Sequence, residues 1–284
     1  MAIDFRIRPP YGESLKMSLF AGQIPANDRF KDAPLSVGKK RIPSAVQGSL
    51  DMMVREMDDA GIDFGVLMGR KTNHPVFGNT KTSELDEICR KYPDRFIPFA
   101  GLNPADADWR EQMDEAVACG CRGIGFDPGW YATPIRCDAP ELMPLYQACE
   151  EKGLIASITC SIYLGPDVSY SDPAAIHRVA ARFPRLKIVV PHAAWPHTPQ
   201  MLGVALICPN VYLMPDCYFY NQHIPFANAI ADAANGYLMG QLLFASSYPV
   251  AGFQAAVDGW SARPLCREAL LNSLHYNAAK LLNL

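Results

Sequence analysis

The sequence lacks several features that would place it in a familiar class. No run reaches the roughly 18 apolar residues that a membrane-spanning helix needs, so we expect no membrane association. Charge of one sign is not in excess either. The formal net charge is −3, and a nucleic-acid surface would need a clustered excess of lysine and arginine. The most basic stretch, Lys39-Lys40-Arg41, is expected to be a solvated loop.

Paired cysteine motifs are also missing. Nine cysteines are scattered without a CxxC pair, and Cys119 and Cys121 are the closest two. An odd count with irregular spacing fits a reducing compartment better than a disulfide framework. The N-terminal run carries Asp4 inside what would have to be the apolar core of a signal peptide. We therefore expect a cytoplasmic protein without a signal peptide.

Two widespread catalytic signatures are absent. No GxGxxG follows the first predicted strand, which removes the usual dinucleotide fingerprint, and we expect no cofactor. No GxSxG elbow is present, so a serine nucleophile is not expected at Ser247. Cys160 ends a predicted strand, but a buried and inert thiol is the better expectation for it.

What the sequence does have is alternation. Apolar residues make up 49% of it and charged residues 19%, which is enough apolar material for an extended core. We predict strands where β-rich runs occur, at residues 2–7, 63–68, 96–101, 123–127, 154–159, 186–191, 211–215 and 242–245. Helical apolar spacing predicts helices at residues 50–60, 83–92, 109–118, 140–152, 173–183, 199–208 and 224–234, with a last one near 264–281. Gly61, Gly120 and Gly153 lie just past three of these helices, where a left-handed C-cap favours glycine.

Strands that alternate with helices imply parallel βαβ units. Eight such units in about 250 residues is the size of a closed (β/α)8 barrel, so we predict one α/β TIM-barrel domain over residues 1–284. A doubly wound open sheet is the second choice. Residues 9–47 carry several prolines and no sustained period. We expect a long loop there after strand one, which is either a lid, a subunit contact in a homo-oligomer, or a surface excursion.

Active sites of such barrels lie at the carboxyl ends of the strands, so residues there are the first candidates. Because side chains alternate along a strand, Asp4, Arg6 and Arg8 are expected to share one face. Two arginines facing a pocket would hold a carboxylate or phosphate. The alternative is that they form internal salt bridges with Asp127 or Asp216, since a buried unpaired charge is costly.

The later strand ends supply the remaining candidates. Asp127 ends strand four and Asp216 ends strand seven, and each could act as a general acid or base. His192 directly follows the apolar strand six and is placed for proton transfer near neutral pH. Trp195 would suit either a pocket wall or the barrel rim, and Ser247 lies at the exit of strand eight.

These strand ends resemble the amidohydrolase-related superfamily, in the branch of the aminocarboxymuconate and resorcylate decarboxylases and the pyrone-dicarboxylate lactonases. Asp4 to Pro9 follows the family's Asp-x-His-x-His-Pro except at the histidines, and residues 186–192 match its apolar run before His192. Residues 245–249 align with its Gly-Ser/Thr-Asp-Tyr-Pro segment, and residues 277–281 with its Asn-Ala-x-x-Leu. The resemblance spans nearly the whole chain and implies the barrel fold.

The metal ligands of the family are largely replaced. Arg6 and Arg8 stand where the resemblance places two histidines, Thr159 where it places a third, and Ser247 where it places an aspartate. Zinc needs three or four nitrogen, oxygen or sulfur ligands, and of the usual set His192 remains. We therefore expect no metal. A site rebuilt from Asp127, His192, Asp216 and Cys160 is the alternative.

By its resemblance to the lactonases, the chain is expected to be a metal-independent hydrolase of a small carboxylated ring compound. Arg6 and Arg8 would bind the carboxylate and polarise a carbonyl, Asp216 would activate water, and His192 would assist the oxyanion or the leaving group. Asp127, Trp195 and Ser247 would complete the substrate site. Two alternatives stay open, a decarboxylase or hydratase of the same superfamily and an inactive protein that binds a carboxylate.

Overall fold

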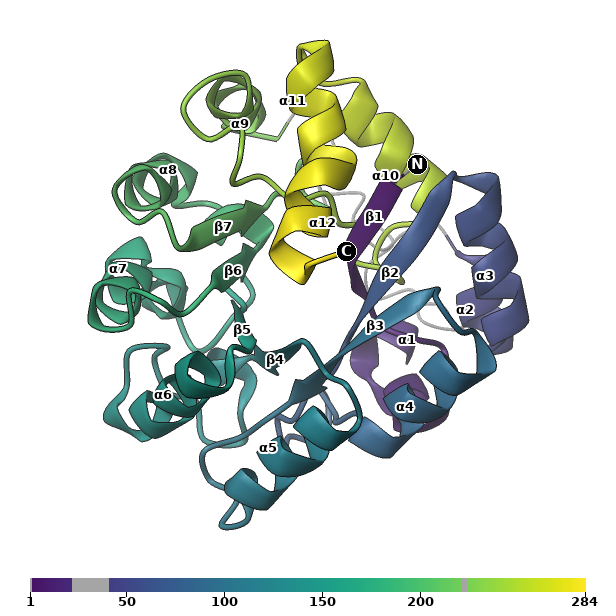
Figure 1. Ribbon diagram of the computed structural model, residues 1–284, viewed down its shortest axis with the longest axis vertical. Coiled ribbons are helices and arrows are strands. Elements are labelled where there is room, and N and C mark those ends of the chain that lie inside the picture. The colour runs from purple at the N-terminus through teal and green to yellow at the C-terminus, as the bar shows by residue number, and fades with distance from the viewer. Residues whose placement is uncertain (1, 22–40, 221–223) are drawn as a thin grey trace.

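The computed structural model describes residues 2–21, 41–220 and 224–284. Seven parallel strands form one curled sheet in chain order, and helices cover its outer side (Figure 1). The strands are β1 (Ala2–Ile7), β2 (Ile62–Met68), β3 (Phe96–Gly101), β4 (Gly123–Phe126), β5 (Ile155–Ile158), β6 (Ile188–Pro191) and β7 (Val211–Met214). The α/β barrel expected from the sequence is thereby confirmed.

The ring is closed by the segment predicted to be strand eight, although its backbone is not regular enough to be a strand. On one side the Leu243 amide donates to the Leu213 carbonyl of β7 (2.9 Å). On the other side the Phe5 amide of β1 donates to the Phe244 carbonyl (3.0 Å), and the Arg8 amide donates to the Tyr248 carbonyl (3.0 Å). Residues 242–248 therefore occupy the eighth position between β7 and β1.

Helices follow most strands and pack on the outside of the ring. The α-helices are α1 (Ser18–Ala21), α2 (Pro43–Gln47), α3 (Leu50–Asp59), α4 (Thr82–Lys91), α5 (Trp109–Ala118), α6 (Met143–Lys152), α7 (Pro173–Arg182), α8 (Thr198–Ile207), α9 (Ala227–Ala234), α10 (Phe253–Ser261), α11 (Arg267–Leu271) and α12 (Asn277–Leu282). A π-helical turn, η7 (Asn272–Tyr276), joins α11 to α12. Short 3-10 turns are η1 (Gly12–Lys16), η3 (Pro128–Trp130), η4 (Pro140–Leu142), η5 (Val168–Ser171) and η6 (His192–Ala194). No helix in the described ranges is both long and apolar enough to cross a bilayer.

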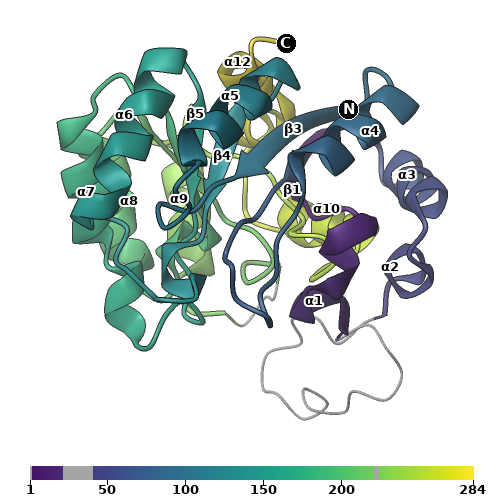
Figure 2. The same cartoon turned by 90° about the horizontal axis from the view of Figure 1, so that it is seen from below.

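The core has two layers, as expected of a barrel. Inside the ring, side chains such as Phe5, Val66, Phe99 and Met214 form one buried cluster, which Leu281 of α12 joins. A larger apolar layer lies between the strands and the surrounding helices. Figure 2 shows α12 at one end of the barrel and α1 at the other.

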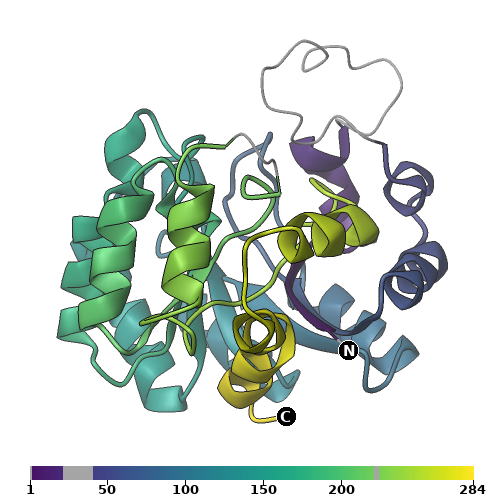
Figure 3. The ribbon, with the colours of Figure 1, turned by 90° about the horizontal axis from the view of Figure 1, so that it is seen from above.

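Several sequence expectations need correction. Residues 9–47 are not a structureless loop, because η1, α1 and α2 form within the described part; the remainder of that loop, residues 22–40, lies outside the described residues. Helix α10 was not predicted, and it packs against α3 (Figure 3). The glycine C-caps were predicted correctly, since Gly61, Gly120 and Gly153 all have φ between 68° and 74°.

Candidate functional site

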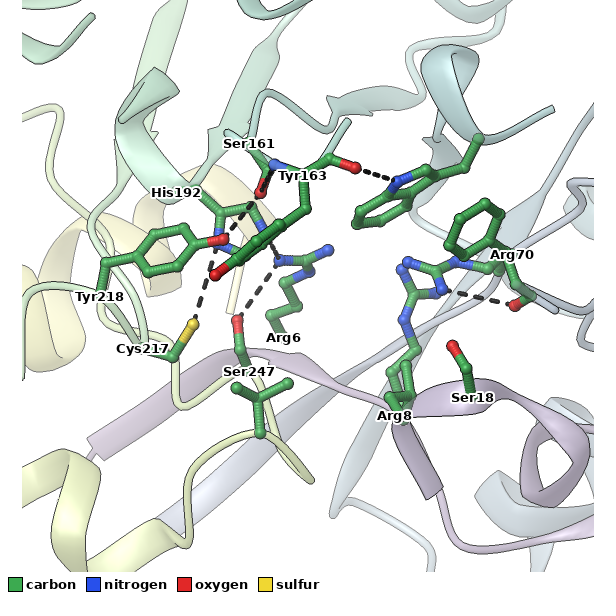
Figure 4. Close-up of a pocket in the computed structure, with 14 residues that line it drawn as sticks. Arg6, Arg8, Ser18, Arg70, Ser161, Tyr163, His192, Cys217, Tyr218 and Ser247 are labelled. Carbon is green, nitrogen blue, oxygen red and sulfur yellow. Dashed lines mark hydrogen bonds between the residues drawn. The ribbon is translucent and has the colours of Figure 1, made fainter. Parts of the chain in front are cut away.

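A pocket of about 170 Å³ opens at the carboxyl ends of the strands, and Figure 4 shows the side chains around it. Cavities near 150 Å³ hold a benzene-sized ring, so this space suits a small cyclic molecule. The polar lining comes from different strand ends, and it includes Arg6 of β1, Arg8 just after β1, Arg70 after β2, Ser161 after β5, His192 after β6, Cys217 after β7 and Ser247 of the closing segment.

The first polar group joins four side chains. Nη1 of Arg6 donates to Nε2 of His192 (2.7 Å) and to a carboxylate oxygen of Asp216 (3.1 Å), and it lies 3.3 Å from Oγ of Ser247. Nδ1 of His192 lies 2.6 Å from the other Asp216 oxygen, and the Ser247 hydroxyl donates to Asp216 at 2.6 Å. We call these four residues, Arg6, His192, Asp216 and Ser247, the histidine cluster.

The hydrogen bonds settle the protonation of His192. A guanidinium has no acceptor, so Nε2 must be the unprotonated nitrogen, and Nδ1 carries the proton that Asp216 accepts. Burial lowers the pKa of His192 below its usual value of 6.5, and Arg6 adds to that decrease while Asp216 opposes it. His192 is therefore neutral at pH 7, with its basic nitrogen facing Arg6.

Asp216 is fully buried, and both of its oxygens are engaged. Burial alone would raise its pKa, but His192 and Arg6 outweigh that effect and hold the pKa below its usual value. A carboxylate in this state orients His192 and balances the charge of Arg6, as the acid of a histidine–aspartate pair does. Asp216 is also not among the residues that line the pocket, so its oxygens do not face the space where a water would be activated.

A second polar group surrounds Asp127. Arg70 donates through Nε (3.1 Å) and Nη2 (3.4 Å) to its two oxygens, and the Thr159 hydroxyl donates at 2.7 Å. Nη2 of Arg8 lies 3.6 Å away, and Nη1 of Arg8 donates to the carbonyls of Met68 and Gly69. Burial opposes ionisation of Asp127, yet Arg70 and Arg8 hold its pKa well below the usual range. We call Arg8, Arg70, Asp127 and Thr159 the arginine pair cluster.

Positive charge exceeds negative charge across the two clusters. Three guanidinium groups, all at least 95% buried, stand against two carboxylates, and His192 is neutral. Arg8 is the cation with the weakest partner, because Asp127 is taken by Arg70 in a two-pronged contact. Burial lowers the pKa of Arg8 well below its ordinary value, and Arg70 adds to that decrease. A buried cation in this situation favours an incoming anion.

Aromatic rings form the walls above the charged floor. Trp130 stacks on Phe77 (centroids 5.3 Å apart), and the Arg70 guanidinium lies over its ring at 4.7 Å. The Trp130 indole donates to the Tyr163 carbonyl at 2.7 Å, which ties the loop after β4 to the loop after β5. Tyr218 lies beside His192, with ring centroids 5.0 Å apart. A flat ring fits between such walls.

Unusual backbone geometry places these side chains. His192, Ala193, Ala194 and Ser247 all have φ between 44° and 63°, a left-handed conformation that costs roughly 1–2 kcal/mol per residue outside glycine. Such strain gathers at functional sites. Gly101 has a different role. A Cβ there would overlap the backbone of Arg70, so only glycine lets the end of β2 carry Arg70 to the pocket.

The structure brings together most of the residues that the sequence singled out. Arg6, His192, Asp216 and Ser247 meet in one cluster, and Arg8 meets Asp127 in the other. Each arginine has a carboxylate partner, so the salt bridges expected from the sequence are present, and each also lines the pocket. Binding of a substrate carboxylate by these arginines stays a prediction.

Three singled-out residues lie elsewhere. Trp195 packs behind Tyr218 (5.3 Å) and does not line this pocket. Asp4 does not share the face of Arg6 and Arg8, because the pairing of β1 with β2 shifts between Asp4 and Ile7; it accepts the amides of Arg6 and Ser246 instead. Cys160 is buried with its thiol against that of Cys137.

Sequence reasoning missed Arg70, Cys217 and the aromatic walls. Arg70 follows β2 by two residues, so the same strand-end rule that selected His192 would have selected it. Cys217 directly follows Asp216 and lines the pocket. Phe77, Trp130 and Tyr163 sit in loops after β2, β4 and β5, where periodicity gives no signal.

The divalent metal that the superfamily resemblance implies does not fit these residues. Arg6 and Arg8 bring fixed positive charge to two ligand positions, and Arg6 occupies the basic nitrogen of His192. The Cys217 thiol is held protonated, because burial and then Asp216 raise its pKa well above the ordinary value. The site rebuilt from Asp127, His192, Asp216 and Cys160 is not assembled either; in the described ranges the potential ligands that converge are His192, Asp216 and Cys217.

Comparisons with known proteins agree with this fold. Residues 17–284 match the family model described as Amidohydrolase. An uncharacterised TIM-barrel protein from Bordetella bronchiseptica shares 33% identity over 99% of this chain and 98% of its own, with a TM-score of 0.90. A 2,6-dihydroxybenzoate decarboxylase from Rhizobium (17% identity, 99% and 98% covered, TM-score 0.70) has the same fold. So does a Pseudomonas putida protein proposed to be a 2-pyrone-4,6-dicarboxylic acid hydrolase (16%, 99% and 97% covered, TM-score 0.70). A search of curated proteins finds no match.

Proposed function

The chain belongs to the amidohydrolase family, and we propose that it is a metal-independent hydrolase that opens a small, carboxylated ring compound of the lactone type. The observation that carries this proposal is the contact of Arg6 with His192 at 2.7 Å, beside an excess of buried positive charge. A cation, a neutral imidazole and an anion-binding group then surround one ring-sized cavity. These are the parts that ester hydrolysis needs in place of a metal.

Arg8 is the proposed anchor for the substrate carboxylate, since it is the least paired cation at the pocket. The ring would lie between the aromatic walls, with its ester carbonyl toward Arg6. Arg6 would donate to the carbonyl oxygen and stabilise the negative charge that develops there, an effect worth about 3–4 kcal/mol for one such donor in other hydrolases.

His192 is the proposed general base and acid. When Arg6 turns to the carbonyl, Nε2 is released and takes a proton from the attacking water, whose oxygen bonds to the carbonyl carbon. Asp216 keeps its bond to the Nδ1 proton and stabilises the imidazolium. The ring C–O bond then breaks, and His192 returns the proton to the leaving oxygen. Asp216 becomes a positioning residue in this scheme, because both of its oxygens are engaged.

The test is a panel of carboxylated lactones and carboxylated phenols, incubated with chelator-treated enzyme and followed by product analysis. We expect ring opening with the uptake of one water and no release of carbon dioxide. Release of carbon dioxide would instead establish a decarboxylase. Thermal stabilisation by a carboxylate without any product would establish a binding protein, and either result would overturn the proposal.

A further inference from the structure

Three side chains with metal-binding atoms converge at the pocket. They are His192, Asp216 and Cys217, all buried. Nδ1 of His192 lies 2.6 Å from an Asp216 oxygen, and Sγ of Cys217 lies 3.6 Å from that oxygen and 4.0 Å from Nδ1. In the described part of the chain no other such group of three is found.

The two separations that involve sulfur are close to those around a tetrahedral zinc ion. Bond lengths near 2.0–2.1 Å to nitrogen and oxygen, and near 2.3 Å to sulfur, place the ligand atoms about 3.3–3.6 Å apart. The two sulfur separations therefore need little change, and the nitrogen–oxygen pair needs to open. Because Cys217 and His192 both line the cavity, a fourth position would face the substrate space. Thiolate, imidazole and carboxylate together favour zinc and similar soft dications.

Arg6 obstructs this group in two ways. It donates to Nε2 of His192, which keeps the single imidazole proton on Nδ1, the nitrogen that would have to bind a metal. Binding at Nδ1 would move that proton to Nε2, where it would face the N–H of Arg6 across 2.7 Å. In addition, Arg6 places a fixed positive charge 3.1 Å from Asp216, which repels a dication and already neutralises the carboxylate.

We propose that His192, Asp216 and Cys217 form a latent site for a soft divalent cation, and that Arg6 keeps it closed. Loss of the Arg6 guanidinium lets the imidazole proton move from Nδ1 to Nε2. The dication then binds Nδ1, Asp216 and the Cys217 sulfur, and one proton, that of the thiol, is released to solvent. The inference rests on the proposed function only in taking the wild-type site to be metal-free.

The experiment is a titration with Co²⁺, since a cobalt–thiolate bond gives a charge-transfer absorption in the near ultraviolet. Wild type, Arg6→Met, Arg6→Gln, Arg6→Lys and the double variant Arg6→Met/Cys217→Ser are compared, with metal per folded chain measured by elemental mass spectrometry. We expect about one Co²⁺ per chain and the thiolate band in the Met and Gln variants. Wild type and the Lys variant, which keeps the positive charge, should bind less than about a tenth of a Co²⁺ ion per chain. The double variant loses the band, and Co²⁺ raises the melting temperature of the Met and Gln variants but not that of wild type or the Lys variant.

The two neutral replacements protect the test against a folding failure, because glutamine keeps a polar group beside Asp216 where methionine does not. Absence of bound Co²⁺ in the variant that folds would overturn the inference and leave the metal-free hydrolase standing. So would a band that survives Cys217→Ser. If wild type bound about one Co²⁺ per chain with the thiolate band, both this inference and the metal-free hydrolase would be overturned, since Arg6 would then not exclude a dication from the site.

Discussion

Arg6 and His192 form the contact on which the chemistry depends, a guanidinium N–H donated over 2.7 Å to the basic nitrogen of a buried imidazole. The pairing keeps His192 neutral and holds Arg6 where a carbonyl oxygen can replace the imidazole as acceptor. Replacing Arg6 by Met should lower kcat/KM by about 10²–10³-fold, because a preorganised donor to the oxyanion is lost. Arg6→Lys keeps the positive charge but not the planar guanidinium with its several N–H donors, so it should lower kcat/KM less than Arg6→Met does. Steady-state kinetics on a lactone found in the panel decide this, and an unchanged kcat/KM in Arg6→Met would remove Arg6 from the mechanism.

The acid limb of the pH profile should report His192. Its pKa is lowered below 6.5 by burial, so the neutral base form persists through neutral pH and is lost only as the pH falls below that value. The expected kcat/KM is flat above about pH 6.5 and decreases tenfold per pH unit well below the lowered pKa. A His192→Asn variant should be slow and lack this limb. An inflection above pH 7 in the wild type would contradict the assignment.

The two arginines that share Asp127 should respond differently to removal. Arg8 is the less well paired cation, so Arg8→Met should raise KM for a carboxylated substrate by about 10–100-fold. It should lower the melting temperature less than Arg70→Met does, because the contacts that it loses are mainly hydrogen bonds to the carbonyls of Met68 and Gly69. Arg70→Met leaves Asp127 buried with a poorer partner, and it should lower stability by about 3–5 kcal/mol. Calorimetry gives the melting temperature and stability of each variant, and steady-state kinetics gives its KM. Equal loss of stability in the two would show that Arg8 is a structural ion-pair partner.

Asp4 should make the protein less stable as the pH rises through the mildly acidic range. Burial raises its pKa from 3.8 to about 7 in the folded protein, and one carboxyl oxygen has no partner. In the unfolded chain Asp4 ionises near pH 4, so unfolding is favoured increasingly from about pH 4 to about pH 7, by up to roughly 4 kcal/mol, and the effect then levels off. Asp4→Asn should flatten this part of the profile and gain stability relative to wild type at pH 8. Urea midpoints of both proteins at pH 5 and pH 8 test it. If the urea midpoint of the wild type instead rose more between pH 5 and pH 8 than that of Asp4→Asn, the predicted effect of Asp4 on stability would have the wrong sign.

Much of the fold follows from the sequence because parallel strands and amphipathic helices have clear periods. The positions of β1, β3 and α5 agree with the sequence expectations to the residue. Residues 242–245 were predicted to form a strand because of their composition. They occupy the eighth position of the ring, between β7 and β1, but they pair with their neighbours only through isolated bridges and single hydrogen bonds. Helix α10 was missed because it lies within a connection that the eight-unit pattern does not require.

The site could be predicted in part because several of its residues lie at the carboxyl ends of strands. Arg6, His192 and Asp216 each close a strand, and the barrel brings strand ends together whatever their separation in the chain. Which partner each one takes is a matter of tertiary geometry. The shift in β1 that separates Asp4 from Arg6, and the left-handed turn that begins at His192, leave no periodic signal. The pairing of Arg70 with Asp127 could not be read from spacing for the same reason.

The most direct test of the central claim is metal content measured together with activity. Untagged protein prepared without chelator is compared with a chelator-treated sample by elemental mass spectrometry, and the lactone hydrolysis rate of each is recorded. We predict less than about a tenth of a metal ion per chain and equal rates in the two samples. Zinc or manganese near one per chain, with a rate that chelation abolishes and metal restores, would contradict it.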